Sequence, residues 1–497
     1  MNARAMVDGA LRSWPVDPRD RLPISLWYSR DIEIATGGTS THHFQASGVE
    51  MDSRDVRPGD LFIALKGEAM DGHRFLPQAF ANGAVAAITD RPVDYPHILV
   101  KDTTLALHGL ADAARDRSKA VRIGVTGSVG KTGVKEAIFA GLDRSSRGGA
   151  HRSVRSYNNH VGVPLSLARL PARSRFGVFE MGMNHTGEIA PLAEHVRPHI
   201  ALITTIAPAH IENLGSLEAI ADEKAAIFSG LVEGGTAIIP ADSEFCDRLI
   251  EHAKIIGVKV ITFGKSETAD VRLLDAISLS SGGSLVTADL GETRLCYTIA
   301  EPGEHWIANS LGVMAAIHAA GGDLGSAGLA LAEMGGLKGR GERINVEVSG
   351  GGKALFVDES YNANPASMRA TLRQLGQTPA TRRIAILGSM MELGDFAARF
   401  HRQLAEPLSS ASVDHAILVG DEMAGLAREL SKLASTGQQG PISFEHCKGP
   451  EEAIAALNDF GVSGGDAILI KGSNSIGLGA VVSHFTQPSQ DEGARDS

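Results

Sequence analysis

The sequence predicts an α/β protein of about three domains, two of which are built on mostly parallel sheets. Its 497 residues exceed what one hydrophobic core normally serves, and typical domain sizes give about three domains. Short apolar strands alternate with helical segments from about residue 104 to 337, and again from 344 to 487. Such alternation is typical of parallel sheets with helices on both faces.

The alternation and the glycine-rich segments divide the chain into five parts. The divisions are a flexible N-terminal extension (1–24), an N-terminal domain (25–104), a central domain (105–337), a C-terminal domain (338–487) and a flexible tail (488–497). The two ends are polar and lack periodicity, so they are left out of the fold prediction.

Charge and cysteine content limit the possible partners. The balance of 47 basic against 58 acidic residues gives a net charge of −11, which argues against a nucleic-acid partner. Cys246, Cys296 and Cys447 are far apart and fit neither a disulfide framework nor a zinc site, so a reducing cytoplasm is expected. No apolar run of about 18 residues predicts a membrane span, and no signal-type core precedes residue 23.

In the N-terminal domain, polar residues gather where predicted elements end. Ser53 and Arg54 precede an apolar strand at 61–65, and Lys66 and His73 follow it before a helix that reaches Asn82. Binding groups often lie at such ends. Solvated loop charges explain the spacing equally well.

The segment 121–136 predicts a buried strand, a glycine turn and a helix start. Gly127 and Gly130 permit backbone N–H groups to converge on an anion, while Lys131 adds a charge for phosphates and Thr132 a hydroxyl for Mg²⁺. The strict P-loop pattern requires glycine where Val125 stands. The shortened form favours ligases that activate a carboxylate with ATP.

Three further polar residues of the central domain are candidates by position. Glu180 closes a strand at 176–182, His210 follows a strand at 200–206, and Lys224 lies in a helix predicted from 217 to about 231. Each has an ordinary explanation as a salt-bridged carboxylate, a non-ligand histidine or a surface charge. A second helix, from about 304 to 320, places His305 and Asn309 on one face.

The C-terminal domain follows a glycine-rich boundary at 337–343 that contains Arg340. Its first strand, at 354–358, ends on Asp358, and a polar loop at 359–365 leads into a helix at 366–375. Further buried strands at 384–388, 416–420 and 467–472 predict a second, smaller doubly wound sheet.

With these motifs in order, the chain resembles the Mur ligases of peptidoglycan synthesis from about residue 26 to 478. The motifs that carry the resemblance are the segments 52–54, 59–67, 126–132, 157–164, 180–189 and 358–368. The last segment is similar to the branch of the family that adds a dipeptide rather than the third residue.

The resemblance implies an N-terminal domain for the UDP end of the substrate, a central ATPase and a Rossmann-like C-terminal domain. It implies an ATP-dependent ligase that joins D-alanyl-D-alanine to the C-terminal carboxylate of UDP-MurNAc-tripeptide through an acyl phosphate. The expected enzyme is a cytoplasmic monomer that uses Mg²⁺.

The resemblance also implies roles for individual residues. The residues implied for ATP binding are Gly127, Ser128, Val129, Gly130, Lys131, Thr132, Gly133, Asn309, Arg340 and Asp358. The residues implied for two Mg²⁺ ions are Thr132 with Glu180 for the first ion, and His210 with Lys224 as a carbamate for the second. Lys131, Glu180, His210 and Lys224 form the catalytic set. Those for the substrates are Ser53, Arg54, Lys66, His73, Asn159, His185, Tyr361, Asn362 and Asn364.

The sequence departs from the family pattern in two places. Ala226 stands where the family has an acidic residue two places after the carbamylated lysine, and the loop at 471–474 lacks the expected following arginine. The second departure affects contacts with the acceptor dipeptide. His401 matches the family's histidine after the segment 392–394.

Three other interpretations remain. A sister ligase would add another amino acid, a P-loop kinase or nucleotide switch would release no amide, and a silent binding module would conflict with the complete metal set. The segment 358–368 argues against the first, and the UDP-type N-terminal module against the second.

Overall fold

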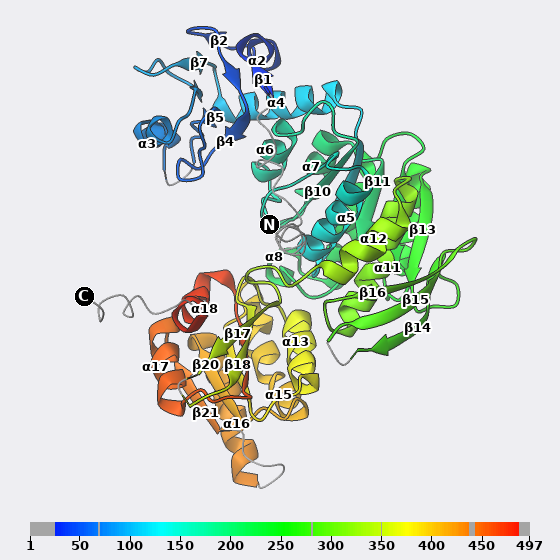
Figure 1. Cartoon of the computed structure of the whole chain (residues 1–497), viewed down its shortest axis with the longest axis vertical. Helices are drawn as coiled ribbons and strands as arrows, with labels where there is room; N and C mark the ends of the chain where they lie inside the picture. Colours follow the sequence, from blue (N-terminus) through cyan, green and yellow to red (C-terminus); the bar gives the residue numbers. More distant parts are fainter. Residues whose placement is uncertain (1–24, 68–69, 280–281, 349, 437–442, 487–497) are drawn as a thin grey trace, which may run out of the picture.

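The computed structural model describes residues 25–67, 70–279, 282–348, 350–436 and 443–486. Three mixed or parallel sheets of five, nine and six strands follow one another along the chain, each with its own helices, in three lobes (Figure 1). The predicted α/β class with three successive units is confirmed. Within these ranges no helix is long and apolar enough to cross a membrane.

The N-terminal unit is a small sheet in the order β2-β7-β6-β5-β4, with β2 antiparallel to β7 and the other pairs parallel. Its elements are β1 (Trp27–Tyr28), α2 (Ser29–Thr36), β2 (Thr39–Ser40), β3 (Gln45–Ala46), β4 (Gly48–Glu50), β5 (Asp60–Ile63), η2 (Gly72–Phe75), α3 (Leu76–Ala81), β6 (Ala86–Thr89) and β7 (His97–Leu99). Helix α4 (Thr103–Arg117) packs on this unit through Leu107 and Leu110. It therefore crosses the predicted boundary at 104, and the domain limits stay predictions.

The central unit is a nine-stranded sheet in the order β16-β15-β14-β13-β12-β11-β8-β10-β9. Its strands are β8 (Val121–Thr126), β9 (Ala150–Arg152), β10 (Phe176–Glu180), β11 (Ile200–Ile203), β12 (Thr236–Pro240), β13 (Lys259–Gly264), β14 (Val271–Ser278), β15 (Ser284–Asp289) and β16 (Arg294–Ile299). Pairing is parallel from β9 to β14, and only the last two pairings are antiparallel. The carboxyl ends of the parallel strands thus lie on one edge.

Helices cover both faces of the central sheet. Its helical elements are α5 (Lys131–Ser145), α6 (Gly162–Ala168), α7 (Ile189–Val196), α8 (Ile211–Leu214), α9 (Leu217–Ala225), η3 (Ala226–Gly230), α10 (Cys246–Ile256), α11 (Glu304–Ala319) and α12 (Leu324–Glu333). Side chains alternate along each strand, so Leu202 packs with α5, α11 and α12 while Ala201 and Ile203 pack with α7 and α9. This burial on both faces explains why the strands are continuously apolar.

The C-terminal unit is a six-stranded sheet in the order β17-β18-β22-β19-β20-β21, parallel except for β17 at its edge. Its strands are β17 (Glu342–Glu347), β18 (Lys353–Glu359), β19 (Arg383–Gly388), β20 (His415–Val419), β21 (Ser443–Cys447) and β22 (Ala467–Lys471). Its helical elements are α13 (Pro365–Gln377), η4 (Gly394–Phe396), α14 (Ala397–Arg402), α15 (Ala405–Ser410), η5 (Asp421–Met423), α16 (Ala424–Thr436), α17 (Pro450–Phe460), η6 (Asn474–Ile476) and α18 (Gly479–Thr486). Helices α17 and α18 cover one face and α13 to α16 the other (Figure 1).

A buried carboxyl group, Glu301, lies beside a second, partly exposed one, Glu359, where the central and C-terminal units meet. Glu301, which is 6% exposed, faces Glu359 across Gly341: a Cβ on Gly341 would lie 3.3 Å from Oε2 of Glu301 and 3.5 Å from Oε1 of Glu359. Burial, and then the charge of Glu359, raise the pKa of Glu301 to about 8. Glu301 is therefore protonated near neutral pH.

This pKa predicts a pH-dependent stability. The folded state holds a proton on Glu301 between the unfolded pKa of about 4.3 and about 8, so the free energy of unfolding falls as pH rises through that window. Glu301→Gln imitates the protonated form. We therefore expect the melting temperature of this variant to fall less between pH 5 and pH 9 than that of the wild type. Glu292→Gln, at an exposed glutamate, is the control. An identical pH dependence in Glu301→Gln and wild type would contradict the assignment.

Candidate active site

The glycine turn between β8 and α5 requires both of its central glycines. Gly127 has φ +146° and Gly130 has φ +86°. A Cβ on Gly127 would collide with Oγ1 of Thr204, and one on Gly130 would lie 2.8 Å from Nδ2 of Asn309. The turn is fixed further because the Ser128 hydroxyl donates to the Ala207 carbonyl at 2.9 Å. A closed turn of this shape, at a helix N-terminus, directs backbone N–H groups at an anion.

Lys131 begins α5, and its side chain folds back over the turn. Its Nζ donates to the Gly127 carbonyl at 2.7 Å. Burial, and then the guanidinium of Arg340, lower the pKa of Lys131, while the carboxylate of Glu180 opposes the shift. The ammonium is thus close to a carboxylate and a guanidinium from two different units.

Glu180 ends β10 beside the turn, with 1% exposure. Its Oε2 accepts a hydrogen bond from the Thr132 hydroxyl at 2.9 Å, and its Oε1 accepts one from Nδ2 of Asn158 at 2.8 Å. A hydroxyl and a carboxylate at hydrogen-bond distance are oxygen donors of the kind that Mg²⁺ prefers. The residues therefore fit the predicted first Mg²⁺ site.

Asn158 was not among the residues singled out from the sequence, although it lies in the segment 157–164. Because its amide orients Glu180, we expect Asn158→Ala to lower kcat about tenfold and to raise the Mg²⁺ concentration needed for half-maximal rate. The measurement is a Mg²⁺ titration of ATP turnover, with Asn345→Ala at an exposed position of β17 as the control. A Mg²⁺ dependence equal to that of the wild type would show that Glu180 needs no such support.

Lys224 is buried, so the interpretation of this residue as a surface charge is wrong. It is 1% exposed near the end of α9, which stops at Ala225 and continues as the 3₁₀ helix η3, and its Nζ lies 3.9 Å from Sδ of Met183. Burial, and then the charge of Lys131, place the pKa of Lys224 well below its usual range. This shift favours the neutral, nucleophilic form of the amine.

His210 lies after β11, at the same sheet edge, and has φ +59° at the start of α8. Its Nδ1 is hydrogen-bonded to the carboxylate of Glu392, which belongs to the C-terminal unit. Within the described residues, no three His, Cys, Asp or Glu side chains converge as a metal site.

Asn309 and Arg340 extend the site towards the C-terminal unit. Asn309 of α11 is 9% exposed and lies against Gly130. Arg340 donates to the Ser156 hydroxyl at 3.1 Å, and its guanidinium lies 4.1 Å from the centre of the Tyr361 ring. Asn309 therefore lies next to the glycine turn. Arg340 lies next to Ser156, whose hydroxyl is close to that of Thr132.

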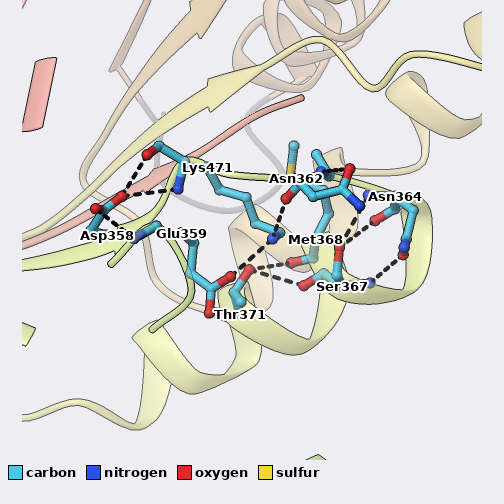
Figure 2. Close-up of polar contacts among 11 residues, drawn as sticks. Asp358, Glu359, Asn362, Asn364, Ser367, Met368, Thr371 and Lys471 are labelled. Atoms are coloured by element: carbon cyan, nitrogen blue, oxygen red, sulfur yellow. Dashed lines mark hydrogen bonds and ion pairs between the residues drawn. The ribbon is translucent and has the colours of Figure 1, made fainter. Parts of the chain in front are cut away.

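Hydrogen bonds to Asp358 and from Lys471 of β22 hold the end of β18 and the loop after it (Figure 2). The carboxylate of Asp358 accepts from the Gly339 N–H at 2.9 Å and from the N–H and hydroxyl of Ser360 at 3.0 and 2.6 Å. Nζ of Lys471 donates to Glu359 at 3.1 Å and to the Asn362 carbonyl at 2.9 Å. These bonds explain why buried charged groups are tolerated in this loop.

Asn364 caps α13, which gives it a role in the fold that the sequence analysis did not assign. Its Oδ1 accepts from the Ser367 N–H at 2.9 Å, and the Ser367 hydroxyl lies 3.1 Å from the Asn364 N–H in return. This reciprocal pair satisfies donors at the helix N-terminus. Tyr361, in contrast, is exposed.

The predicted substrate residues of the N-terminal unit occupy two loops. Ser53 is buried, and Arg54 is exposed with its guanidinium 2.6 Å from Asp52. In the second loop Asp71 pairs with Lys66 through the backbone and accepts from Nδ1 of His73 at 2.6 Å. The structure thus places Lys66 and His73 in one loop, where each contacts Asp71, and Ser53 and Arg54 in the other loop.

The last predicted positions, Asn159 and His185, lie in two different loops of the central unit, after β9 and after β10. Arg155, with φ +56°, forms an ion pair with Asp55 at 2.7 Å and so connects the two units. Oδ1 of Asn159 accepts from the Gly162 N–H at 2.9 Å. His185 is exposed, with Nδ1 3.3 Å from Glu188.

The fold and the glycine turn define a P-loop nucleotide-binding protein with a buried carboxylate and a buried lysine at the phosphate end. Models of three families match in sequence order: the Mur ligase catalytic domain at residues 45–115, the Mur ligase middle domain at 125–317 and the glutamate ligase domain at 339–474. The chain belongs to the Mur ligase family.

Several relatives match over most of their length. The UDP-N-acetylmuramoyl-tripeptide–D-alanyl-D-alanine ligase of Rickettsia prowazekii is 33% identical over 465 residues, which cover 93% of this chain and 100% of the relative. The ligase of the same name from Escherichia coli is 36% identical and covers 80% of this chain and 87% of its own length. The crystal structure of MurF from Acinetobacter baumannii aligns with a TM-score of 0.79 at 28% identity, covering 94% of this chain and 100% of that chain.

Proposed function

We propose that this protein is an ATP-dependent amide ligase that joins D-alanyl-D-alanine to the C-terminal carboxylate of UDP-MurNAc-tripeptide. The observation that carries the proposal is the convergence of Lys131, Thr132 and Glu180 at one glycine turn, together with a buried Lys224 whose pKa is lowered by burial and by the charge of Lys131. The curated relatives that bear the name of this ligase support the choice of substrates. The products are UDP-MurNAc-pentapeptide, ADP and phosphate.

The chemistry requires that the carboxylate be activated before the amine attacks. A carboxylate oxygen attacks the γ-phosphorus of ATP, the bond to ADP breaks, and an acyl phosphate forms. The amine of the dipeptide then adds to the acyl carbon, loses a proton, and phosphate departs with one former carboxylate oxygen. Positioning and charge neutralisation are the main tasks of the protein in such transfers.

Residues of the glycine turn hold the triphosphate in this proposal. The N–H groups of 127–133 bind phosphate oxygens, and Lys131 neutralises charge as the phosphoryl group moves. Thr132 with Glu180, and His210 with Lys224, would hold two Mg²⁺ ions, which when bound withdraw electron density from phosphate oxygens. Asn309 would contact adenine, and Arg340 and Asp358 would approach phosphate and ribose.

The carbamate on Lys224 follows from the state of its amine. A neutral amine attacks CO₂, releases one proton and becomes an anionic oxygen ligand, whereas an ammonium would repel Mg²⁺. Burial and the low pKa of Lys224 favour this reaction. The carbamate would also supply the acidic oxygen that Ala226 does not provide.

The remaining predicted residues would contact the organic substrates. Ser53 and Arg54 would bind the uridine nucleotide, and Lys66, His73, Asn159 and His185 would line its path towards the glycine turn. Tyr361, Asn362 and Asn364 would meet the acceptor side. Since Asn364 caps α13, its role would be to hold the loop between β18 and α13 in place.

The test is phosphate release from Mg-ATP with UDP-MurNAc-tripeptide, with and without D-alanyl-D-alanine, together with the mass of the product. We expect release that requires both substrates and a product heavier by the dipeptide residue. Release with a different amine would favour a sister ligase, and release without any amine acceptor would favour a kinase or nucleotide switch.

A further inference from the structure

A polar contact between two units holds His210 at the edge of the proposed active site. Nδ1 of His210, in the central unit, is hydrogen-bonded to Oε2 of Glu392, in the loop that precedes η4 of the C-terminal unit. Since a carboxylate only accepts, Nδ1 carries the proton. Both residues have left-handed backbone angles, φ +59° and +62°, which are uncommon for residues with a Cβ.

The backbone around this contact is shaped to fit. The Glu212 N–H approaches the Glu392 carbonyl at 3.5 Å, and Gly394, with φ +51°, lies against the Glu212 side chain. A Cβ on Gly394 would be 2.9 Å from Cγ of Glu212. The segment 392–394 therefore rests directly on the start of α8, which continues towards α9 and Lys224.

The hydrogen bond decides which ring nitrogen of His210 is available. In the neutral imidazole with Nδ1 donating to Glu392, the lone pair lies on Nε2, the nitrogen that would face a metal ion. Carboxylates that accept from the second nitrogen of a metal-binding histidine fix its tautomer and orientation. Here the carboxylate comes from the unit that must approach the central sheet before the acyl phosphate can be protected from water.

We propose that Glu392 is a positioning residue for His210, so that binding of the second Mg²⁺ depends on docking of the C-terminal unit. This inference rests on the function proposed above, in which His210 is a ligand of that ion. The dependence is reciprocal: docking strengthens metal binding, and metal binding strengthens docking. Through Glu392, the affinity of the site for the second Mg²⁺, and with it phosphoryl transfer, depends on the position of the C-terminal unit.

The experiment compares Glu392→Ala and Glu392→Gln with the wild type. Binding of Mn²⁺ in the presence of ADP is followed by electron paramagnetic resonance, which needs no turnover, and the radius of gyration is followed by small-angle X-ray scattering. We expect Glu392→Ala to weaken the second Mn²⁺ about tenfold and to reduce the Mn²⁺-induced compaction. Glu392→Gln should retain most of the affinity, because its amide oxygen still accepts from Nδ1.

Asp395→Asn, at an exposed position of η4 directly after this loop, is the matched control and should bind Mn²⁺ like the wild type. The side chain of Glu392 is 44% exposed, so both variants are expected to melt near the wild-type temperature. Where ligase activity is measured, Glu392→Ala should lower kcat without changing KM for the UDP substrate.

A double-mutant cycle of Glu392→Ala with His210→Ala shows whether Glu392 affects Mn²⁺ binding by positioning His210 or independently of it. We expect the two losses of Mn²⁺ affinity to be strongly non-additive. Wild-type Mn²⁺ affinity in Glu392→Ala, or fully additive losses, would overturn the inference. Failure of the wild type to form product would instead overturn the proposed function, since Mn²⁺ binding is measured without it.

Discussion

Replacing Lys131 with alanine is expected to lower kcat by about 10³-fold, the loss typical of removing a preorganised group that stabilises transition-state charge. The ammonium lies on the glycine turn and close to Glu180, where the transferred phosphoryl group would pass. Single-turnover phosphate release with both substrates measures the effect. Binding of UDP-MurNAc-tripeptide should be unchanged, because that substrate is assigned to other residues.

Lys119→Ala is the control for this variant. Lys119 is exposed just before β8, at the opposite end of the strand that leads to the turn, and should tolerate the change with wild-type kcat. A Lys131→Ala enzyme that retained a tenth or more of wild-type kcat would contradict the phosphate-binding role of this turn.

Replacing Lys224 with alanine is expected to lower kcat by about 10² to 10³-fold, since the proposed carbamate would hold a Mg²⁺ ion, and such an ion supplies several kcal/mol of charge stabilisation. The space vacated by the buried side chain should accept a small carboxylate, so millimolar acetate or propionate should restore part of the rate. The reason is that an added carboxylate could replace the oxygens of the proposed carbamate. Rescue is measured as the ratio of kcat with and without the acid.

The carbamate itself is tested on the wild type with ¹³C-labelled CO₂ and nuclear magnetic resonance. Because burial lowers the pKa of Lys224, labelling should persist at pH values where an ordinary lysine is fully protonated. Lys224→Ala should show no carbamate signal at this position, and Lys119→Ala should show the wild-type signal. A wild-type spectrum without the signal, together with no rescue by acids, would contradict the assignment.

Local backbone requirements explain what the sequence predicted well. The turn at Gly127 and Gly130 is encoded by residues adjacent in sequence, and strands such as Phe176–Glu180 are apolar because helices cover both faces. Family motifs then placed Glu180 beside Thr132, and the structure shows the hydrogen bond between them. In the first two cases the information lies within one short segment, and in the third it lies in two motifs of the family.

The features that the sequence did not predict depend on packing between distant segments. Lys224 is flanked by acidic residues and looks like a surface charge, but the orientation of α9 turns it towards Met183. The contact between His210 and Glu392 joins residues 182 positions apart. Asn364 was assigned to substrate from its motif, whereas its side chain caps α13, a role that depends on where the helix begins.

The most direct test of the central claim follows oxygen from the donor carboxylate to phosphate. UDP-MurNAc-tripeptide labelled with ¹⁸O at both oxygens of its terminal carboxylate is incubated with enzyme, Mg-ATP and D-alanyl-D-alanine, and the released phosphate is analysed by mass spectrometry. Activation through an acyl phosphate predicts one ¹⁸O atom in each phosphate and one in the new amide. Unlabelled phosphate would show that water, not the carboxylate, attacks ATP, and would contradict the proposed ligase mechanism.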